Sequence, residues 1–246
     1  MFKQLNVRIF RFDPESEGKP RFDHFEVPFS GKMAILDVLL YIQNYVDSTV
    51  AFRYACRYAM CGSCAVYVNG KPCLACKTRV TELRTSDITL QPLPNFPIIR
   101  DLAVDMAPFM EKWKRMKPYY VGSKEITEPV IISPGSGERE FIDDMIKCIG
   151  CGACYSACTM VATGEEFIGP AALTRAYTLI ADKRDAMSIE RLKMVDKYFG
   201  VWRCHAEFNC AEACPKHVVP TRAIQQLKKR NILGRFGIFR KIYRRG

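Results

Sequence analysis

The first part of the chain alternates apolar and polar side chains, as β-strands do, apart from one helical segment. Within residues 1–13, Leu5, Val7 and Ile9 alternate with polar residues, and residues 22–29 form a second alternating segment, which is typical of half-buried strands. Residues 33–46 switch to helical spacing, so that their apolar side chains share one face. Those side chains are Ile35, Val38, Leu39 and Ile42. We therefore expect two strands followed by an amphipathic helix.

A β-hairpin is predicted after this helix. Residues 65–68 have the composition of a strand and lead into Asn69-Gly70, the dipeptide that most strongly indicates a tight hairpin turn. Residues 74–76 lead away from the turn, and residues 88–90 form a last short strand. Strands around one helix predict a small α+β domain, with a cysteine-bearing loop between the helix and the hairpin.

The next segment, residues 91–97, separates this domain from a helical one. It contains three prolines, and each lacks an amide donor and restricts the residue before it. Beyond it the apolar residues recur at helical spacing. The helical segments are residues 103–116, 139–148, 170–184, 188–199 and 221–230. We therefore expect two domains, residues 1–105 and residues 106–246, the second mostly α with its cysteines in loops.

Composition places the chain among globular proteins and narrows its compartment. Of its 246 residues, 48% are hydrophobic and 26% charged, which excludes a disordered or fibrous protein. Charges occur too early for a signal peptide, and the longest uncharged run, residues 148–164, is too short for a membrane-spanning helix of about 20 residues. A protein that is not exported stays in a reducing compartment. Its twelve cysteines therefore indicate metal binding or redox chemistry rather than disulfides.

Positive charge is concentrated at the C-terminus. Residues 228–246 hold eight Lys or Arg and no acidic residue, within a net charge of +11. Apolar side chains recur among these charges at roughly helical spacing, which favours a helix near a membrane surface or a docking partner. They are Phe236, Phe239, Ile242 and Tyr243. A solvated terminal helix and a nucleic-acid-binding arm are the alternatives.

The first cysteine set has the spacing of a plant-type 2Fe-2S cluster site. Cys56, Cys61 and Cys64 follow the pattern C-x4-C-x2-C. Gly62 lets the loop backbone curl close to a cluster. The fourth ligand comes from the hairpin, where Cys73 and Cys76 both stand within range. A zinc ribbon is the structural alternative, but the set lacks the paired knuckles of such a site.

The second domain contains a duplicated bacterial ferredoxin motif. Its first copy has the spacing C-x2-C-x2-C-x3-C and begins at Cys148, and the fourth cysteine of such a run binds the cluster of the other copy. The second copy runs from Cys204 to Cys214-Pro215, with Glu207 in place of its second cysteine. This exchange assigns a 4Fe-4S cluster to the thiolates of Cys148, Cys151, Cys154 and Cys214. The third cluster has Cys158, Cys204 and Cys210.

Three thiolates predict a 3Fe-4S cluster, because a corner without a thiolate holds its iron weakly. The competing interpretation is that the Glu207 carboxylate binds a fourth iron, since oxygen also ligates iron. It is disfavoured because a buried carboxylate beside an anionic cluster is electrostatically costly.

Four segments of the chain resemble the iron–sulfur subunit family of succinate dehydrogenase and quinol:fumarate reductase. They are RYACRYAMCGSC, KCIGCGACYSAC, EEFIGPAALTRAY and VWRCHAEFNCAEACPKHVVPTRAI. The resemblance implies an α+β chain in which a plant-type ferredoxin domain of β-grasp form precedes an all-α bacterial ferredoxin-like domain. It also favours Cys76 over Cys73 as the fourth 2Fe-2S ligand.

The same resemblance implies partners and a location. The chain would pass electrons between the FAD of a flavoprotein subunit, where succinate and fumarate interconvert, and menaquinone or ubiquinone at a membrane anchor, usually a cytochrome b with haem b. The 2Fe-2S cluster would lie nearest the flavin and the 3Fe-4S cluster nearest the quinone. The subunit would be peripheral on the cytoplasmic face of the inner (plasma) membrane. It would hold no catalytic residue of its own, and no dinucleotide-binding glycine motif occurs in the sequence.

Two residues match positions near quinone in the family, and two depart from its pattern. His205 matches a histidine of succinate dehydrogenases and Lys228 a lysine of fumarate reductases, although a loop histidine and a tail charge explain them equally well. Thr159 stands where many relatives have proline, and Glu207 where the residue is usually apolar. Two other functions compete with this one, a soluble polyferredoxin and a thiol-linked or heterodisulfide reductase subunit. The latter usually has adjacent cysteine pairs, which are absent here.

Overall fold

The computed structural model describes residues 3–15, 18–122, 128–129, 131–164 and 166–235. The apolar and basic residues predicted to form a helix at 236–246 lie outside the described residues. By its internal contacts the chain forms two compact units, the first made of residues 1–108 and 149–157, the second of residues 109–148 and 158–246. These units reflect packing and not independent folding, so the domain boundary at residue 105 stays a prediction.

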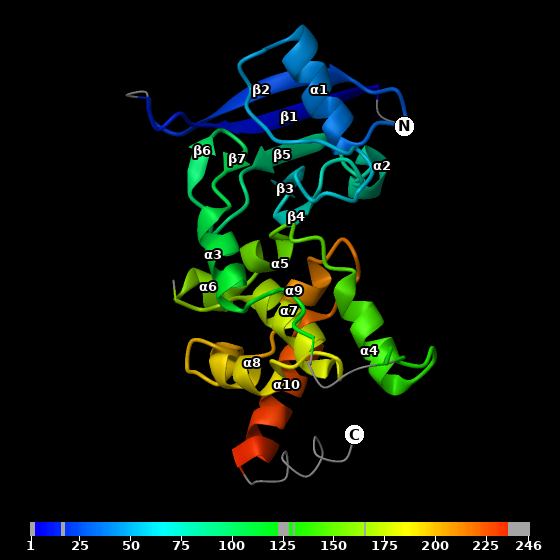
Figure 1. Ribbon diagram of the computed structural model, residues 1–246. Helices are drawn as coiled ribbons and strands as arrows, with labels where there is room; N and C mark the ends of the chain where they lie inside the picture. The colour runs from blue at the N-terminus through cyan, green and yellow to red at the C-terminus, as the bar shows by residue number, and fades with distance from the viewer. Residues whose placement is uncertain (1–2, 16–17, 123–127, 130, 165, 236–246) are drawn as a thin grey trace. The chain divides into compact units, whose positions relative to one another are not determined.

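A mixed five-stranded sheet forms the centre of the first unit (Figure 1). Its strands are β1 (Gln4–Arg11), β2 (Arg21–Pro28), β3 (Ala65–Val68), β4 (Lys71–Leu74) and β5 (Asp87–Gln91). They lie in the order β2-β1-β5-β3-β4. Strand β1 is antiparallel to β2 and parallel to β5, while β3 pairs antiparallel with both β4 and β5. The first and last strands of this sheet, β1 and β5, therefore lie side by side.

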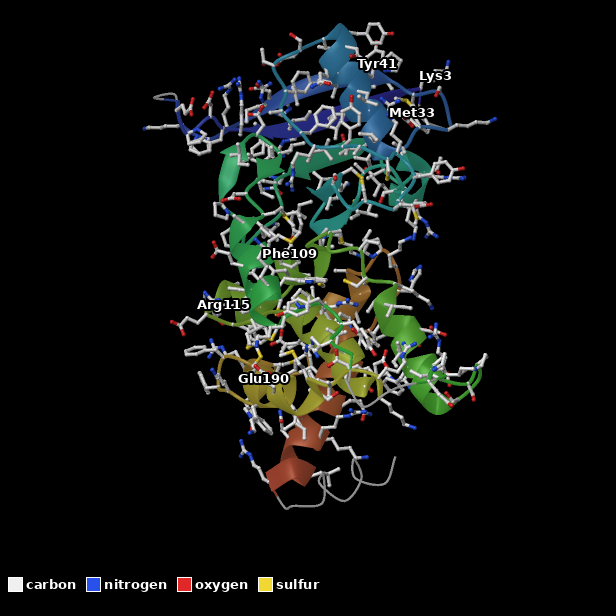
Figure 2. The ribbon with its side chains drawn as sticks, viewed as in Figure 1. Lys3, Met33, Tyr41, Phe109, Arg115 and Glu190 are labelled. Atoms are coloured by element: carbon white, nitrogen blue, oxygen red, sulfur yellow. The ribbon has the colours of Figure 1, made fainter. Side chains whose placement is uncertain are left out.

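Helix α1 (Ile35–Tyr45) supplies the apolar layer of this unit. The four residues predicted for its apolar face are all buried, together with Leu36. On β1 the alternation also holds, because Leu5, Val7 and Ile9 are buried while Gln4, Asn6 and Arg8 are exposed. Each such side chain contributes about 1.5–3 kcal/mol when it leaves water. Tyr41, on α1, can be located in Figure 2.

The hairpin turn has the conformation that the Asn-Gly dipeptide predicts. Asn69 and Gly70 both have positive φ, 45° and 83°, as a type I′ turn requires. The Asn69 side chain accepts a hydrogen bond from the amide of Thr89 at 2.7 Å and donates one to the carbonyl of Asp87 at 3.1 Å. It thereby holds the turn against β5 and fixes the register of β3 and β4. Cys64 directly precedes β3, and Cys76 follows β4.

A buried arginine fixes the segment that leads into the cysteine loop. The Arg11 guanidinium lies 2.6 Å from the Asp47 carboxylate and 3.2 Å from that of Asp101. A hydrogen bond from Thr49 and the contact with Arg11 lower the pKa of Asp47 to about 2. Asp101 also accepts hydrogen bonds from the amides of Phe12 and Ala51. These contacts hold residues 47–51, directly before the first cysteine set.

The remaining elements of the first unit are short. They are α2 (Val80–Leu83), β6 (Ile98–Arg100), β7 (Ala103–Val104) and α5 (Ala153–Ser156). The helix predicted at 103–116 was wrong at its start, because α3 (Ala107–Arg115) begins four residues later and residues 103–104 pair with β6. Pro108 near the helix start explains the boundary, since proline has no amide donor to lose there. Phe109, the next residue, is buried (Figure 2).

The second unit is helical, with loops between its helices (Figure 1). Its helices are α3 from Phe109 onward, α4 (Gly137–Ile146), α6 (Thr159–Ala162), α7 (Pro170–Ala181), α8 (Ser188–Val195), the 3-10 turn η1 (Val201–Arg203), α9 (Asn209–Glu212) and α10 (Pro220–Arg235). Helix α7 is at the centre, since it packs against α4, α8 and α10, and all but one of its residues are buried. No helix in the described residues is long and apolar enough to cross a membrane.

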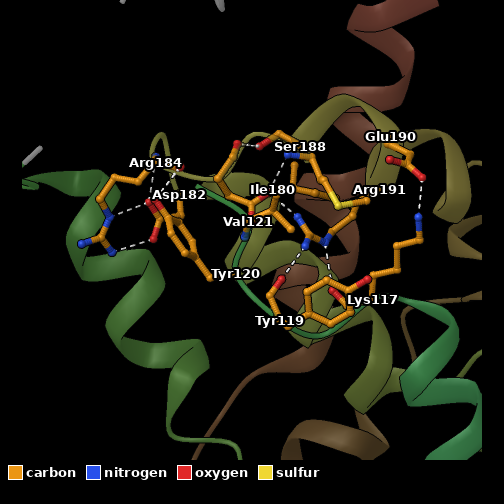
Figure 3. A network of polar contacts seen from close by, with 12 residues as sticks. Lys117, Tyr119, Tyr120, Val121, Ile180, Asp182, Arg184, Ser188, Glu190 and Arg191 are labelled. Atoms are coloured by element: carbon orange, nitrogen blue, oxygen red, sulfur yellow. Dashed lines mark hydrogen bonds and ion pairs between the residues drawn. The ribbon is translucent and has the colours of Figure 1, made fainter. Parts of the chain in front are cut away.

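A second buried arginine ties the segment after α3 to α8 (Figure 3). The Arg191 side chain is fully buried and forms an ion pair with Asp185. It also donates hydrogen bonds to the carbonyls of Lys117 and Tyr119, at 3.2 and 2.6 Å. Asp185 in turn accepts a hydrogen bond from the amide of Val121 at 3.1 Å. This network holds residues 117–121 against α8 without any regular secondary structure.

Candidate iron–sulfur cluster sites

The first cysteine set lies on an irregular loop and on the residues after β4. Cys56 and Cys61 are exposed, Cys64 is buried and Cys76 is partly buried. No cysteine of the described residues forms a disulfide, so each sulfur remains able to bind metal. The alternative ligand Cys73 lies within β4, paired with Val66.

Backbone amides in this loop point at two of the sulfur atoms. The Cys56 Sγ accepts hydrogen bonds from three amides at 3.3–3.4 Å, those of Tyr58, Met60 and Cys61. The Cys76 Sγ accepts one from Ala59 at 3.3 Å. Amide donors stabilise negative charge on sulfur, and hydrogen bonds to sulfur set the potential of a cluster. This cradle supports Cys76 as a ligand, because the loop aims a donor at its sulfur.

The loop adopts this shape through left-handed backbone conformations. Arg57 and Ala59 have φ of 56° and 55°, and Gly62 has φ of 76°. For residues with a side chain this conformation costs roughly 1–2 kcal/mol each. At Gly62 there is also no room for a side chain, because a Cβ atom would lie 2.8 Å from the Cβ of Cys151. The first cysteine loop is therefore in direct contact with the loop of the second set.

Thiol pKa values differ across the first set according to exposure. Hydrogen bonds from Ser63 and from the Cys56 region lower the pKa of Cys61 to about 6. Burial raises the pKa of Cys64 to about 12 and that of Cys73 to about 11. Since thiolates and not thiols bind metal, the exposed Cys61 ionises more readily than the buried Cys64 before a cluster is present.

The second set is distributed over both compact units. Cys151 and Cys154 belong to the first, where Asn95 donates a hydrogen bond to the carbonyl of Ser156 at 3.0 Å. Gly152 has φ of 81°, and a Cβ there would lie 2.9 Å from the ring of Phe96. Cys148 and Cys214 belong to the second unit. The assignment of these four cysteines to a 4Fe-4S cluster therefore stays a prediction from their spacing in the sequence.

The third set surrounds one cavity of the second unit. Its lining includes the three cysteines of the set, one from each of three chain segments. They are Cys158, Cys204 and Cys210. His205, Thr159 and Glu207 line the same cavity. The structure thus brings together all three predicted 3Fe-4S ligands and the residue that replaces a fourth.

Helix α10 supports this cavity through two polar contacts. The Thr221 hydroxyl lies 3.1 Å from the Cys210 Sγ, and burial raises the pKa of that thiol to about 11. The Lys228 ammonium donates a hydrogen bond of 2.7 Å to the carbonyl oxygen of Cys204. Lys228 is therefore fixed on the cysteine loop and is not a free charge of the tail. His205 is exposed at the cavity. A role of either residue at quinone stays a prediction.

The two departures from the family pattern contact each other. The Thr159 hydroxyl donates a hydrogen bond to the Glu207 carboxylate, and both side chains are exposed. The sequence identifies each residue separately. It does not reveal the pairing, because the two positions are 48 residues apart.

The donor chemistry suits iron–sulfur clusters. In the described part of the chain no three His, Cys, Asp or Glu side chains stand close enough to hold one ion. The ligands of a cluster bind different irons and stand further apart. The cysteine thiols of the described residues, none of them in a disulfide, and the amides directed at sulfur fit such a group.

Two protein-family models match the chain. A model described as a 2Fe-2S iron-sulfur cluster binding domain matches residues 6–111, and one described as a 4Fe-4S dicluster domain matches residues 144–218. The chain is 37% identical to the fumarate reductase iron-sulfur subunit of Haemophilus influenzae over 236 residues, 91% of each chain. It is 38% identical to that of Escherichia coli over 226 residues, 92% of each. The chain belongs to the fumarate reductase iron–sulfur subunit family.

Other members of this family extend the match. The fumarate reductase iron-sulfur subunit of Mycobacterium tuberculosis is 36% identical over 229 residues, 93% of each chain. Among solved structures, a chain of the Mycobacterium smegmatis Sdh1 complex in the apo form superimposes with a TM-score of 0.84 at 27% identity. The superposition covers 96% of this chain and 98% of that one. The predicted family is confirmed, and so is the α+β fold, with a 2Fe-2S ferredoxin domain before a mostly helical ferredoxin-like domain.

Proposed function

We propose that this iron–sulfur subunit relays electrons between the FAD of a flavoprotein subunit and a quinone at a membrane anchor, within a succinate:quinone oxidoreductase. One observation carries the proposal. Eleven cysteines fall into three ligand sets in one chain, inside the two cluster-domain matches. A polyferredoxin that diffuses between partners is disfavoured, because the match to fumarate reductase iron-sulfur subunits covers more than nine tenths of the chain.

The ligand sets follow from spacing and from the donors around each sulfur. A 2Fe-2S cluster is assigned to Cys56, Cys61, Cys64 and Cys76. A 4Fe-4S cluster is assigned to Cys148, Cys151, Cys154 and Cys214, and a 3Fe-4S cluster to Cys158, Cys204 and Cys210. When bound, the clusters accept and donate single electrons, at potentials set by cluster type, hydrogen bonds and exposure. The chain supplies the ligands, the separation and the surroundings.

Residues of the first unit shape the flavin end of the relay. The amides that point at the sulfur atoms of Cys56 and Cys76 stabilise negative charge there. The exposed Cys56 and Cys61 place one edge of the site at the surface, where a flavoprotein partner could approach. The close contact of Gly62 with Cys151 keeps the first and second ligand loops adjacent. We therefore expect electrons to pass directly between the first and second centres.

Residues around the third cavity shape the quinone end. Lys228 uses one ammonium hydrogen for the Cys204 carbonyl, and an ammonium group has three donors. We infer that its remaining donors and the exposed His205 imidazole donate to a quinone oxygen and stabilise negative charge that develops on it. Partners in this arrangement are the FAD flavoprotein and an anchor, usually a cytochrome b with haem b. The basic residues 228–246 favour the anionic cytoplasmic membrane surface.

Paired cysteine variants in the purified complex test this function. Cys204→Ser should abolish succinate-driven quinone reduction while a dye that takes electrons from the flavin is still reduced, because only the last link is broken. Cys73→Ser should keep both activities, because Cys73 is not assigned as a ligand. Quinone reduction at the wild-type rate in the Cys204 variant contradicts the relay. Loss of the 2Fe-2S spectrum in the Cys73 variant contradicts the choice of Cys76.

A further inference from the structure

The loop that carries Glu207 repeats the backbone conformation of the loop that carries Cys151. In the first loop, the residues on either side of Cys151 are glycines with positive φ, 63° at Gly150 and 81° at Gly152. In the second loop, the residues on either side of Glu207 also have positive φ, 59° at Ala206 and 66° at Phe208. Each loop then enters a four-residue helix at the next residue, α5 or α9. Glu207 therefore occupies a ligand position in structure as well as in sequence.

This conformation is unfavourable for the residues that adopt it in the second loop. Ala206 and Phe208 have side chains, and a left-handed backbone costs roughly 1–2 kcal/mol for each of them. Strain of this kind persists only where the surroundings impose it, and it is concentrated at functional sites. The loop keeps the shape that presents residue 207 to a cluster although the thiolate at that position is lost.

The Glu207 carboxylate is able to act as a ligand. It lines the cavity that contains Cys158, Cys204 and Cys210. One of its oxygens, Oε2, accepts the hydrogen bond from Thr159, and Oε1 accepts none from the described residues. Glu207 is exposed, so its charged carboxylate stays hydrated. The electrostatic cost expected for a buried carboxylate at this position therefore does not apply. Thr159 orients the group and leaves one oxygen available.

We propose that Glu207 is a reversible fourth ligand, which lets the reduced third cluster bind a divalent cation, Fe²⁺ foremost, at its open corner. The inference rests on the proposed function, because it requires the 3Fe-4S cluster assigned above. In the step, a neutral [3Fe-4S] core, reduced by one electron from the relay, takes up Fe²⁺ and becomes a [4Fe-4S]²⁺ core. Hydrated Fe²⁺ would lose its water ligands and gain three bonds to cluster sulfides and one to the Glu207 Oε1, and no further electron or proton is needed.

The protein offers this cation a single ligand and leaves the other three to the cluster. That division agrees with the finding that no three acidic, histidine or cysteine side chains of the described chain could hold an ion by themselves. A carboxylate binds iron less firmly than a thiolate, because thiolate is the softer ligand that iron–sulfur clusters select. The fourth iron should therefore leave again when the cluster is oxidised, unlike an iron held by four cysteines.

The test is an anaerobic Fe²⁺ titration of the dithionite-reduced, purified complex. After each addition, excess iron is removed, the sample is mildly reoxidised, and the EPR signal of the oxidised 3Fe-4S cluster is measured. In the wild type the signal should fall with added Fe²⁺ and return after treatment with a chelator and a stronger oxidant. Glu207→Gln keeps the size of the side chain and removes its charge, so half-loss should require at least about tenfold more Fe²⁺. Mössbauer spectra with ⁵⁷Fe should show the added iron inside the cluster.

Glu212→Gln is the matched control, since Glu212 is an exposed acid of the neighbouring helix α9. It should titrate like the wild type. A signal that Fe²⁺ leaves unchanged, or equal titrations for Glu207→Gln and the wild type, overturns the inference while the proposed function stands. If the oxidised complex has no 3Fe-4S signal before any addition, the proposed cofactor assignment itself fails.

Discussion

Substituting Gly62 by alanine should loosen the first cluster, because this glycine meets two separate structural demands. Its φ of 76° is left-handed, and a Cβ atom would lie 2.8 Å from the Cβ and 3.0 Å from the Cα of Cys151. The backbone conformation costs alanine roughly 1 kcal/mol. Pushing a methyl group into a packed contact costs about 1–3 kcal/mol more. Gly62→Ala should therefore destabilise the native loop by about 2–4 kcal/mol.

Gly70→Ala separates the two contributions. Gly70 also has a left-handed φ, 83°, but nothing lies within 4 Å of the position its Cβ would take. It shares the backbone cost and lacks the overlap, so the two variants should differ by about 1–3 kcal/mol. If the strain is relieved in the transition state of unfolding, this difference makes Gly62→Ala unfold about 5- to 150-fold faster than Gly70→Ala. The measurement is the rate at which 2Fe-2S absorbance disappears when the purified complex is exposed to guanidinium. Equal rates would refute the close approach of the two loops.

Two further variants test the contacts that hold the second unit. Arg191→Met should destabilise the complex by about 3–5 kcal/mol, because it leaves the Asp185 carboxylate buried without its ion-pair partner. Differential scanning calorimetry would show this loss of stability. The double variant Arg191→Met/Asp185→Asn should recover part of it. A calorimetric profile for the single variant that matches the wild type contradicts the network in Figure 3. Lys228→Met should lower kcat/KM for quinone about tenfold or more, through loss of a charge-assisted hydrogen bond to the Cys204 carbonyl. Reduction of a dye that takes electrons from the flavin should stay unchanged. Equal losses in both assays would place Lys228 outside the quinone end.

Much of the first domain was predictable, because its signals are local. Alternation on β1 and helical spacing on α1 both follow from burial on one face. The turn at Asn69-Gly70 follows from the positive φ that both residues adopt. The sequence missed α2, α5, α6 and α9, each of four residues. A helix of one turn is too short to show periodicity.

The ligand sets were also readable from spacing, whereas the surroundings of the sulfur atoms were not. The amides that donate to Cys56 are backbone groups, and any sequence carries them. Their direction depends on left-handed residues such as Arg57 and Ala59, which give no compositional signal. The hydrogen bonds from Thr159 to Glu207 and from Lys228 to the Cys204 carbonyl join residues that are distant in sequence. Such contacts appear only once the chain is folded.

Metal analysis of the purified, chelator-treated and oxidised complex, combined with low-temperature EPR, decides whether three clusters are held by this one chain. We expect about nine irons per iron–sulfur subunit, after correction for haem, no stoichiometric zinc, and an EPR signal from an oxidised 3Fe-4S cluster. Zinc bound by the cysteines, or about ten irons with no such signal under these oxidising conditions, would contradict a third cluster that has only three thiolate ligands.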